Sequence, residues 1–287
     1  MRLPRQIYYC GISGALAGLF AWLIIGWTRA AYWQNLWLSC AFVGAGTGGL
    51  IAIALAFTRG LVEHWSYCRL GPTAFASLGC GALVGAVGLL VGQALFLTVG
   101  GEWLGRIFGW VMLSLLIGLG YSLRNVSARR CLVSGVGGLV AGLFSGLIYE
   151  GLTQLFLTYS STAQIWASSI GFMTVGGLLA TGIPLAETLV ARGVLIVLSG
   201  QRKGSEYVIL DHLLLGCSES CRVLIPDDPE IEPEQILLQV DAKGIRITNV
   251  GRSCAITVNG VSLPPGETTL CQSGGIIRVG RTNLRLL

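Results

Sequence analysis

This sequence has little charge and little of the usual chemistry of enzymes. Only 11% of its 287 residues are Asp, Glu, Lys or Arg, and its two histidines are His64 and His212. We find no HExxH motif, P-loop, Ser-His-Asp arrangement or paired acidic motif, which argues against hydrolytic and nucleotide-dependent mechanisms. The nine cysteines form no CxxC pair, which argues against a zinc site or a disulfide framework. We therefore expect a protein that is not an enzyme and carries neither a cofactor nor a metal.

Nucleic acid is also an unsuitable partner. The formal net charge is +5, but the arginines do not form a basic stripe of the kind that tracks a phosphate backbone. They lie at the ends of long apolar runs, as Arg59, Arg69 and Arg124 do. In that position positive charge sets the orientation of a membrane protein. The sequence therefore predicts no nucleic-acid binding.

Long apolar runs occupy the first two thirds of the chain. Hydrophobic residues make up 53% of the sequence, and a helix that spans a bilayer needs about 20 residues. The runs that are long enough lie at about residues 7–27, 36–57, 74–99, 104–123, 131–158 and 164–190. We expect six transmembrane helices. The first is retained, because its run has no cleavage site typical of a signal peptide.

The connections between these runs predict an orientation. Positive charge is concentrated in the even-numbered connections and beside both ends of the membrane region, for example at Arg5, Arg129 and Arg192. Cytoplasmic segments carry the excess of Lys and Arg. We therefore expect an integral membrane protein of a bacterial-type inner or plasma membrane, surrounded by lipid bilayer, with both termini in the cytoplasm.

Glycines four residues apart recur in the odd-numbered runs. Such spacing places a smooth strip on one helix face, where a neighbouring backbone can approach closely. The residues predicted to pack in this way are Gly14, Gly18, Gly81, Gly85, Gly138, Gly142 and Gly146. Their recurrence suggests a hairpin repeated three times. Small residues on every helix also permit a homo-oligomer or a larger membrane complex.

Polar side chains are rare inside the apolar runs. Ionisable groups at that depth are costly and mark substrate or ion pathways. Gln93 and Glu150 are the candidates for an intramembrane polar site. A transporter or channel regulated by its tail is therefore the alternative function, with Glu150 as a coupling carboxylate. The other interpretation of Glu150 is an interfacial residue or the partner of a nearby arginine.

From residue 194 the pattern changes to short apolar runs separated by Gly, Pro, Asn and Asp. Many short strands with such turns predict a β-sandwich. The expected strands are 194–198, 207–211, 213–215, 222–225, 236–240, 245–250, 256–258, 268–271, 276–279 and 283–287. The sequence thus predicts a six-helix transmembrane domain at 1–190 and a cytoplasmic β-sandwich domain at 194–287.

Four segments of this tail resemble landmarks of the forkhead-associated (FHA) domain. They are Leu215–Asp227, Ile231–Ile236, Asn249–Gly260 and Gly274–Gly280. They are similar to the family's Gly-Arg loop, its Ser-x-x-His segment, its segment ending in Val-Asn-Gly and its closing Gly-rich segment. The resemblance implies a β-sandwich that in its typical form binds phosphothreonine peptides through loops at one end.

The resemblance is degenerate at its ligand positions. The family's phosphate-binding Arg falls on Cys217, its Ser on Glu232, its structural His on Gln235, and the Asn that contacts the peptide backbone on Cys254. A carboxylate at the Ser position would repel phosphate. The predicted partner-binding loop residues are Cys217, Ser218, Arg222, Glu232, Gln235, Arg252, Ser253, Cys254 and Asn259.

These patterns together predict a signalling scaffold. We expect a non-catalytic adaptor whose six helices anchor an FHA-like domain that binds partner proteins at the cytoplasmic membrane face. The lost ligand positions predict that this binding does not read phosphothreonine.

Overall fold

The computed structural model describes residues 3–30, 33–62, 67–99, 103–123, 128–156, 161–200, 202–218, 221–226, 228–241 and 244–287. Its contacts divide the chain into a helical unit, Pro4–Ala186, and a β unit that contains Glu187–Leu287. The basic and acidic residues at 63, 64, 102 and 124 lie outside the described residues.

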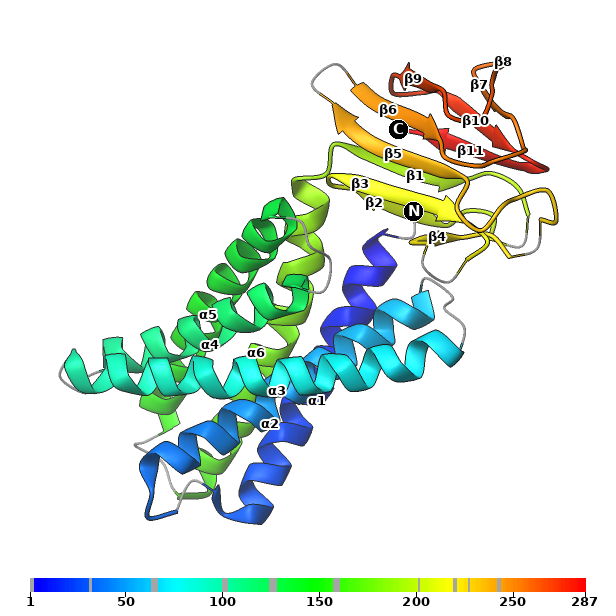
Figure 1. Cartoon of the computed structure of the whole chain (residues 1–287). Coiled ribbons are helices and arrows are strands. Elements are labelled where there is room, and N and C mark those ends of the chain that lie inside the picture. Colours follow the sequence, from blue (N-terminus) through cyan, green and yellow to red (C-terminus); the bar gives the residue numbers. More distant parts are fainter. Residues whose placement is uncertain are drawn as a thin grey trace. The chain divides into compact units, whose positions relative to one another are not determined.

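Six helices among the described residues are long and apolar enough to cross a membrane. They are α1 (Leu3–Thr28), α2 (Leu36–Val62), α3 (Tyr67–Thr98), α4 (Trp103–Leu123), α5 (Ala128–Phe156) and α6 (Ser161–Leu189) (Figure 1). The six predicted runs are confirmed as helices, although most extend beyond the apolar stretch. The start of α3 differs most from the prediction, because this helix continues through Pro72 to Tyr67.

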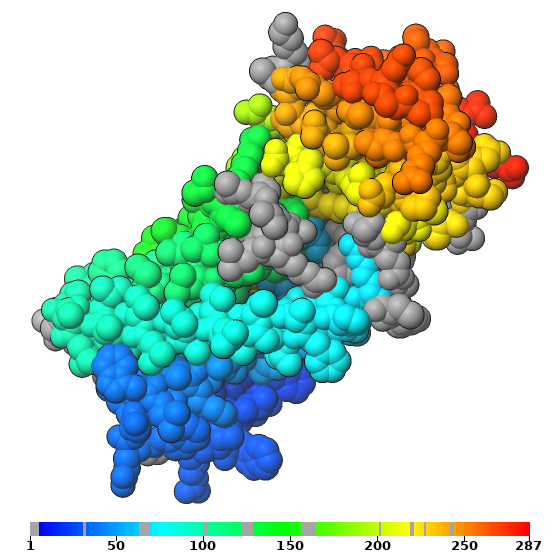
Figure 2. All heavy atoms as spheres, viewed as in Figure 1, coloured from blue at the N-terminus to red at the C-terminus, as the bar shows by residue number. Residues whose placement is uncertain are grey.

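The helices approach most closely where side chains are missing. Each odd-numbered helix places two glycines against the backbone of an even-numbered helix, so that an added Cβ would collide with a carbonyl oxygen. The pairs are Gly14 with Gly176, Gly18 with Phe172, Gly81 with Gly48, Gly85 with Gly44, Gly138 with Ser114, and Gly142 with Trp110. Figure 2 shows one such contact, where α3 (cyan) lies on α2 (blue) along the visible face.

These contacts follow a cyclic order. The strip of α3 packs on α2, that of α5 on α4, and that of α1 on α6. The indole Nε1 of Trp22 in α1 also donates to the hydroxyl oxygen of Ser168 in α6, at 2.9 Å. Gly146 extends the α5 strip, because a Cβ there would lie 3.2 Å from the Cα of Ile107 in α4. The repeated strips therefore join successive hairpins rather than the two helices of one hairpin, and α1 with α6 closes the ring.

Eleven strands in the described part of the β unit form two sheets. The strands are β1 (Gly193–Val197), β2 (Glu206–Ile209), β3 (His212–Gly216), β4 (Val223–Leu224), β5 (Ile236–Asp241), β6 (Gly244–Asn249), β7 (Ile256–Val258), β8 (Val261–Leu263), β9 (Thr268–Cys271), β10 (Ile276–Val279) and β11 (Thr282–Leu286). One sheet has the order β2-β1-β11-β10-β7-β8 and the other β4-β3-β5-β6-β9. All ten predicted strands are present, three of them (β7, β9 and β10) with the predicted bounds and the others with shifted ends. The sequence interpretation missed β8.

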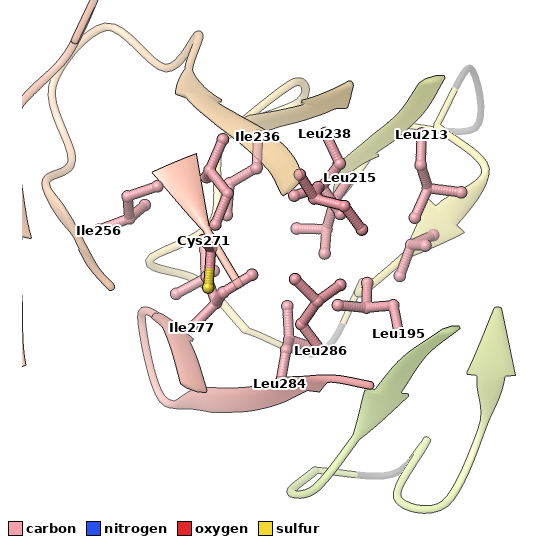
Figure 3. Close-up of a cluster of buried hydrophobic side chains, with 14 of the residues drawn as sticks. Leu195, Leu213, Leu215, Ile236, Leu238, Ile256, Cys271, Ile277, Leu284 and Leu286 are labelled. Atoms are coloured by element: carbon pink, nitrogen blue, oxygen red, sulfur yellow. The ribbon is translucent and has the colours of Figure 1, made fainter. Parts of the chain in front are cut away.

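Side chains from both sheets meet in one core, which makes the unit a sandwich. Leu195, Leu284 and Ile277 come from the first sheet, and Leu215 and Ile236 from the second; all five are fully buried (Figure 3). Their alternation with outward residues follows the two-residue period of a strand. Each such side chain contributes about 1.5–3 kcal/mol by burial. The predicted fold class, a helical membrane bundle followed by a β-sandwich, is confirmed.

The Asn-Gly turn joins β7 to β8. Asn259 and Gly260 have φ angles of 51° and 85°, and Val258 pairs with Val261 across the turn. Two consecutive positive φ angles characterise the two-residue hairpin that Asn-Gly favours. The turn therefore needs a strand on each side of it, and β8 is the second.

Candidate functional site

The strand order brings three loops to one end of the sandwich. Leu215 near the end of β3 pairs with Ile236 at the start of β5, and Ile236 pairs with Asn249 at the end of β6. The segments that leave or enter these strands there are therefore neighbours. We call residues 217–218, 221–222, 228–235 and 250–255 the loop end.

Two buried amides hold the loop end together. The side chains of Gln235 and Asn249 are fully buried, and the Gln235 Nε2 donates to the Asn249 Oδ1 at 3.0 Å. Both amide nitrogens also donate to the carbonyl oxygen of Cys254, at 3.1 and 2.9 Å. The Gln235 Oε1 accepts from the backbone N–H of Glu232 at 3.1 Å. Buried amides that are satisfied in this way rigidify the backbone around them.

Gly251 lets the second loop lie directly over this pair. Its N–H donates to the Asn249 Oδ1 at 3.1 Å and to the Gln235 carbonyl oxygen at 3.3 Å. An added Cβ would collide with the Gln235 Nε2. Only glycine permits such a close approach. The backbone of residues 250–254 is thus fixed by hydrogen bonds that do not involve the Glu232 side chain.

The Glu232 carboxylate accepts hydrogen bonds from the same loop. Its Oε2 accepts from the Arg252 N–H at 2.7 Å. Its Oε1 accepts from the N–H groups of Ser253 and Cys254, at 2.7 and 3.2 Å, and from the Ser253 hydroxyl at 2.6 Å. Successive N–H groups that converge on one point form an anion-binding concavity. Glu232 therefore binds this chain's own backbone.

These donors lower the pKa of Glu232 to about 2. The Ser253 hydroxyl contributes most, followed by the N–H groups of Arg252 and Ser253. Hydrogen bonds to the charged form favour ionisation. The carboxylate is consequently ionised throughout the physiological pH range.

The loop after β3 is tied to the same place. The N–H groups of Cys217 and Ser218 donate to the carbonyl oxygens of Glu232 and Pro233, both at 3.0 Å. The Cys217 side chain packs against the sandwich core. A residue in that orientation offers no charged donor to a ligand at the loop end. Residues 219 and 220 of this loop lie outside the described residues.

Of the two remaining predicted residues, Arg222 lies at the edge of the loop end and Asn259 lies outside it. The N–H of Arg222 donates to the carbonyl oxygen of Leu214 at 3.1 Å, where the chain enters β4. Asn259 lies at the opposite end of β7 from Cys254, and its Oδ1 accepts from the Ile276 N–H at 2.8 Å. The structure thus brings together Cys217, Ser218, Glu232, Gln235, Arg252, Ser253 and Cys254, and it places Asn259 apart from them.

The sequence interpretation missed Asp228. This residue is 6% exposed, and its Oδ2 accepts from the Arg281 N–H at 2.7 Å and the Thr282 hydroxyl at 3.1 Å. It lines a cavity of about 370 Å³ together with Arg202 and Ser199. The Asp228-Pro229 step was the available signal, because Asp before Pro favours a turn. Among the described residues no group of three or more His, Cys, Asp or Glu is placed to hold a metal ion.

In the helical unit, Glu150 forms an ion pair. The Arg106 Nε and Nη2 donate to its two carboxylate oxygens at 2.9 and 2.5 Å, and the Gln154 amide donates at 3.2 Å. The Gln93 Oε1 lies 3.8 Å from the Cys40 Sγ. Gln93 and Arg106 line a cavity of about 250 Å³, and Glu150 lines a second one of about 390 Å³. Glu150 thus has an arginine partner, and its role as a coupling carboxylate stays a prediction.

No protein-family model and no curated protein matches this chain. Solved structures do match, and they cover its C-terminal β part. The FHA domain of CT664 protein from Chlamydia trachomatis is 17% identical, with 34% of this chain and 97% of that one covered and a TM-score of 0.31. An FHA domain of an Arabidopsis thaliana protein is 19% identical over 34% and 86%, with a TM-score of 0.31. The cytoplasmic domain of the type III secretion sorting platform protein PscD from P. aeruginosa is 20% identical over 33% and 78%, with a TM-score of 0.29.

Proposed function

We propose that this protein is a non-catalytic membrane adaptor. Residues 1–190 anchor it in the bilayer. Residues 194–287 form a cytoplasmic FHA-like domain that binds partner proteins at the membrane face through its loop end. Recognition there depends on the shape and polar groups of the loops and does not require phosphothreonine.

The observation that carries this proposal is the position of the Glu232 carboxylate. A phosphate at the loop end needs free N–H or hydroxyl donors and preferably an arginine. The donors at residues 252–254 are already bonded to Glu232, and position 217 holds a cysteine that packs inward. An incoming dianion would meet a fixed negative charge instead of donors.

The Arg106–Glu150 pair supports an anchor rather than a transporter. A coupling carboxylate must exchange a proton or an ion, whereas Glu150 is 5% exposed and held by two hydrogen bonds from one guanidinium. Removing one partner of such a pair leaves a buried charge uncompensated. The pair is therefore well suited to joining α4 to α5.

Peptide titration tests the absence of phosphate recognition. The full chain in lipid nanodiscs is titrated with a degenerate phosphothreonine peptide library and with the same library carrying threonine. We expect no difference between the two libraries. Binding of the phosphorylated library in the micromolar range, and not of the other, would overturn the proposal.

Affinity purification in mild detergent tests the adaptor role. Proteins that copurify with the full chain are compared with those that copurify after deletion of 194–287. The variant Arg252→Glu changes the exposed loop end, and Arg285→Glu makes the same charge change on the outer face of β11. We expect partners to be lost with the deletion and with Arg252→Glu, and retained with Arg285→Glu. Partners that remain after the deletion would place the function in the helices.

A further inference from the structure

The three consecutive N–H groups at residues 252–254 keep their positions for a reason independent of Glu232. Gln235 and Asn249 hold the Cys254 carbonyl oxygen, and Asn249 and the Gln235 backbone accept from Gly251. None of these contacts involves the Glu232 side chain, which accepts from the N–H groups of residues 252–254. The concavity is therefore preorganised, and the carboxylate fills it without building it.

The contents of the concavity define what it binds. Three N–H groups and one hydroxyl donate to two oxygens of a single anion, at 2.6 to 3.2 Å. The exposed Arg252 adds a positive charge beside them. Such an arrangement binds oxyanions in general, because the donors recognise charge and oxygen geometry and not the atom that bears the oxygens.

We propose that residues 252–254 form a latent oxyanion site, which the chain closes with Glu232 as a tethered ligand. An external oxyanion binds there once the Glu232 carboxylate is removed or displaced. This inference rests on the proposed function, since it names the contact that keeps the loop end from reading phosphate. It adds that the ability to bind phosphate is blocked at one side chain and is not lost from the loop.

The test uses Glu232→Ala in the full chain, with inorganic phosphate as the probe. Glu234→Ala is the matched control, because Glu234 is a neighbouring exposed carboxylate, and the N–H groups of residues 252–254 donate to Glu232 in the described contacts. Calorimetric titration at constant ionic strength, set with chloride, measures binding. We expect Glu232→Ala to bind phosphate at least about tenfold more tightly than the original chain and Glu234→Ala.

Two further variants locate the site and guard against misfolding. Ser253→Ala in the Glu232→Ala background removes one donor, and we expect it to weaken phosphate binding severalfold. Glu232→Gln keeps the size of the side chain while removing its charge, and we expect phosphate to displace the neutral amide. If Glu232→Ala fails to fold, Glu232→Gln decides the question.

The outcomes separate this inference from the proposed function. A folded Glu232→Ala or Glu232→Gln chain that binds phosphate no better than Glu234→Ala overturns the latent site and leaves the adaptor function standing. Phosphate-dependent binding of the phosphothreonine library by the unaltered chain overturns the proposed function. A gain in binding that Ser253→Ala does not reduce would place the phosphate elsewhere and would also overturn the latent site.

Discussion

In the helical unit the helices meet along strips where side chains are absent, whereas the core of the β unit is filled by large side chains. The Gly85 backbone lies against that of Gly44, while Leu215 and Ile236 fill the sandwich from one sheet. The difference follows from the surroundings of each unit. A helix among lipids gains little by burying more apolar surface, so close backbone fit decides its packing. A sandwich in water gains stability from each apolar side chain it buries.

The largest expected effect is the loss of a core side chain from the sandwich. Leu215 is fully buried, so Leu215→Ala removes apolar contact and leaves a cavity. We expect a loss of about 3–4 kcal/mol in the free energy of unfolding of the β unit. Denaturant unfolding, followed by circular dichroism at the signal of the β-sheets, measures this loss of stability. The control is Leu214→Ala on the same strand, because the Leu214 side chain is only partly buried. An equal loss of stability in the two variants would contradict the idea that buried side chains stabilise the β unit.

In the helical unit, the addition of a side chain to the glycine strip should reduce stability. Gly85→Leu adds a side chain where a Cβ already collides with the Gly44 carbonyl oxygen. We expect a loss of about 2–3 kcal/mol, the upper part of the range for overpacking. Thermal stability in detergent measures it. Gly79→Leu on the same helix is the control, because no atom lies within 4 Å of a Cβ added there. Equal melting temperatures for the two variants would show that the glycine strip does not hold α3 to α2.

A third substitution tests a polar contact inside the otherwise apolar sandwich. Gln235→Leu keeps most of the volume but removes the hydrogen bonds to Asn249, Cys254 and the Glu232 N–H. We expect a loss of about 2 kcal/mol, because buried polar partners are left unsatisfied. Urea unfolding measures it, with the exposed Gln239→Leu on β5 as the control. Unchanged stability would mean that the amide pair is dispensable, and the preorganised loop would lose its support.

The smallest expected effect concerns pH. The folded-state pKa of Glu232 is lowered from 4.5 to about 2, so its contribution to stability is present above pH 4.5 and is lost as pH falls towards 2. We expect the difference in melting temperature between the original chain and Glu232→Gln to be largest near pH 7 and to shrink below pH 4. Differential scanning measurements from pH 7 to pH 3 check this. A constant difference would mean that the charge of Glu232 does not contribute.

The elements were predictable from the sequence wherever a local pattern specifies them. Apolar length specified the six helices, and turn residues separated ten of the eleven strands. β8 was missed because its three residues run directly into Pro264 and Pro265, which read as loop. The start of α3 was misjudged because Pro72 lies early enough in the helix to be tolerated.

The partners of each residue were much less predictable. The sequence singled out Glu232 as a charge in an unfavourable place for phosphate, but its bonds to Arg252 and Ser253 depend on strand order. The separation of Asn259 from Cys254 likewise depends on the direction of β7. The Asp228 carboxylate accepts from three donors, two of which, Arg281 and Thr282, come from the segment that enters β11, far along the chain. Contacts between distant segments are set by topology, which residue spacing alone does not reveal.

The pairing of α1 with α6 has a consequence for how the protein assembles during its synthesis. Gly14 and Gly18 meet their partners only when Phe172 and Gly176 have been synthesised. At the usual rate of translation this is on the order of ten seconds later. During that interval the glycine face of α1 lacks its α6 partner, whereas Gly44 and Gly48, the partners of the α3 strip, are made before α3 itself. The ring is therefore complete only once α6 has been made, just before the first strand of the sandwich.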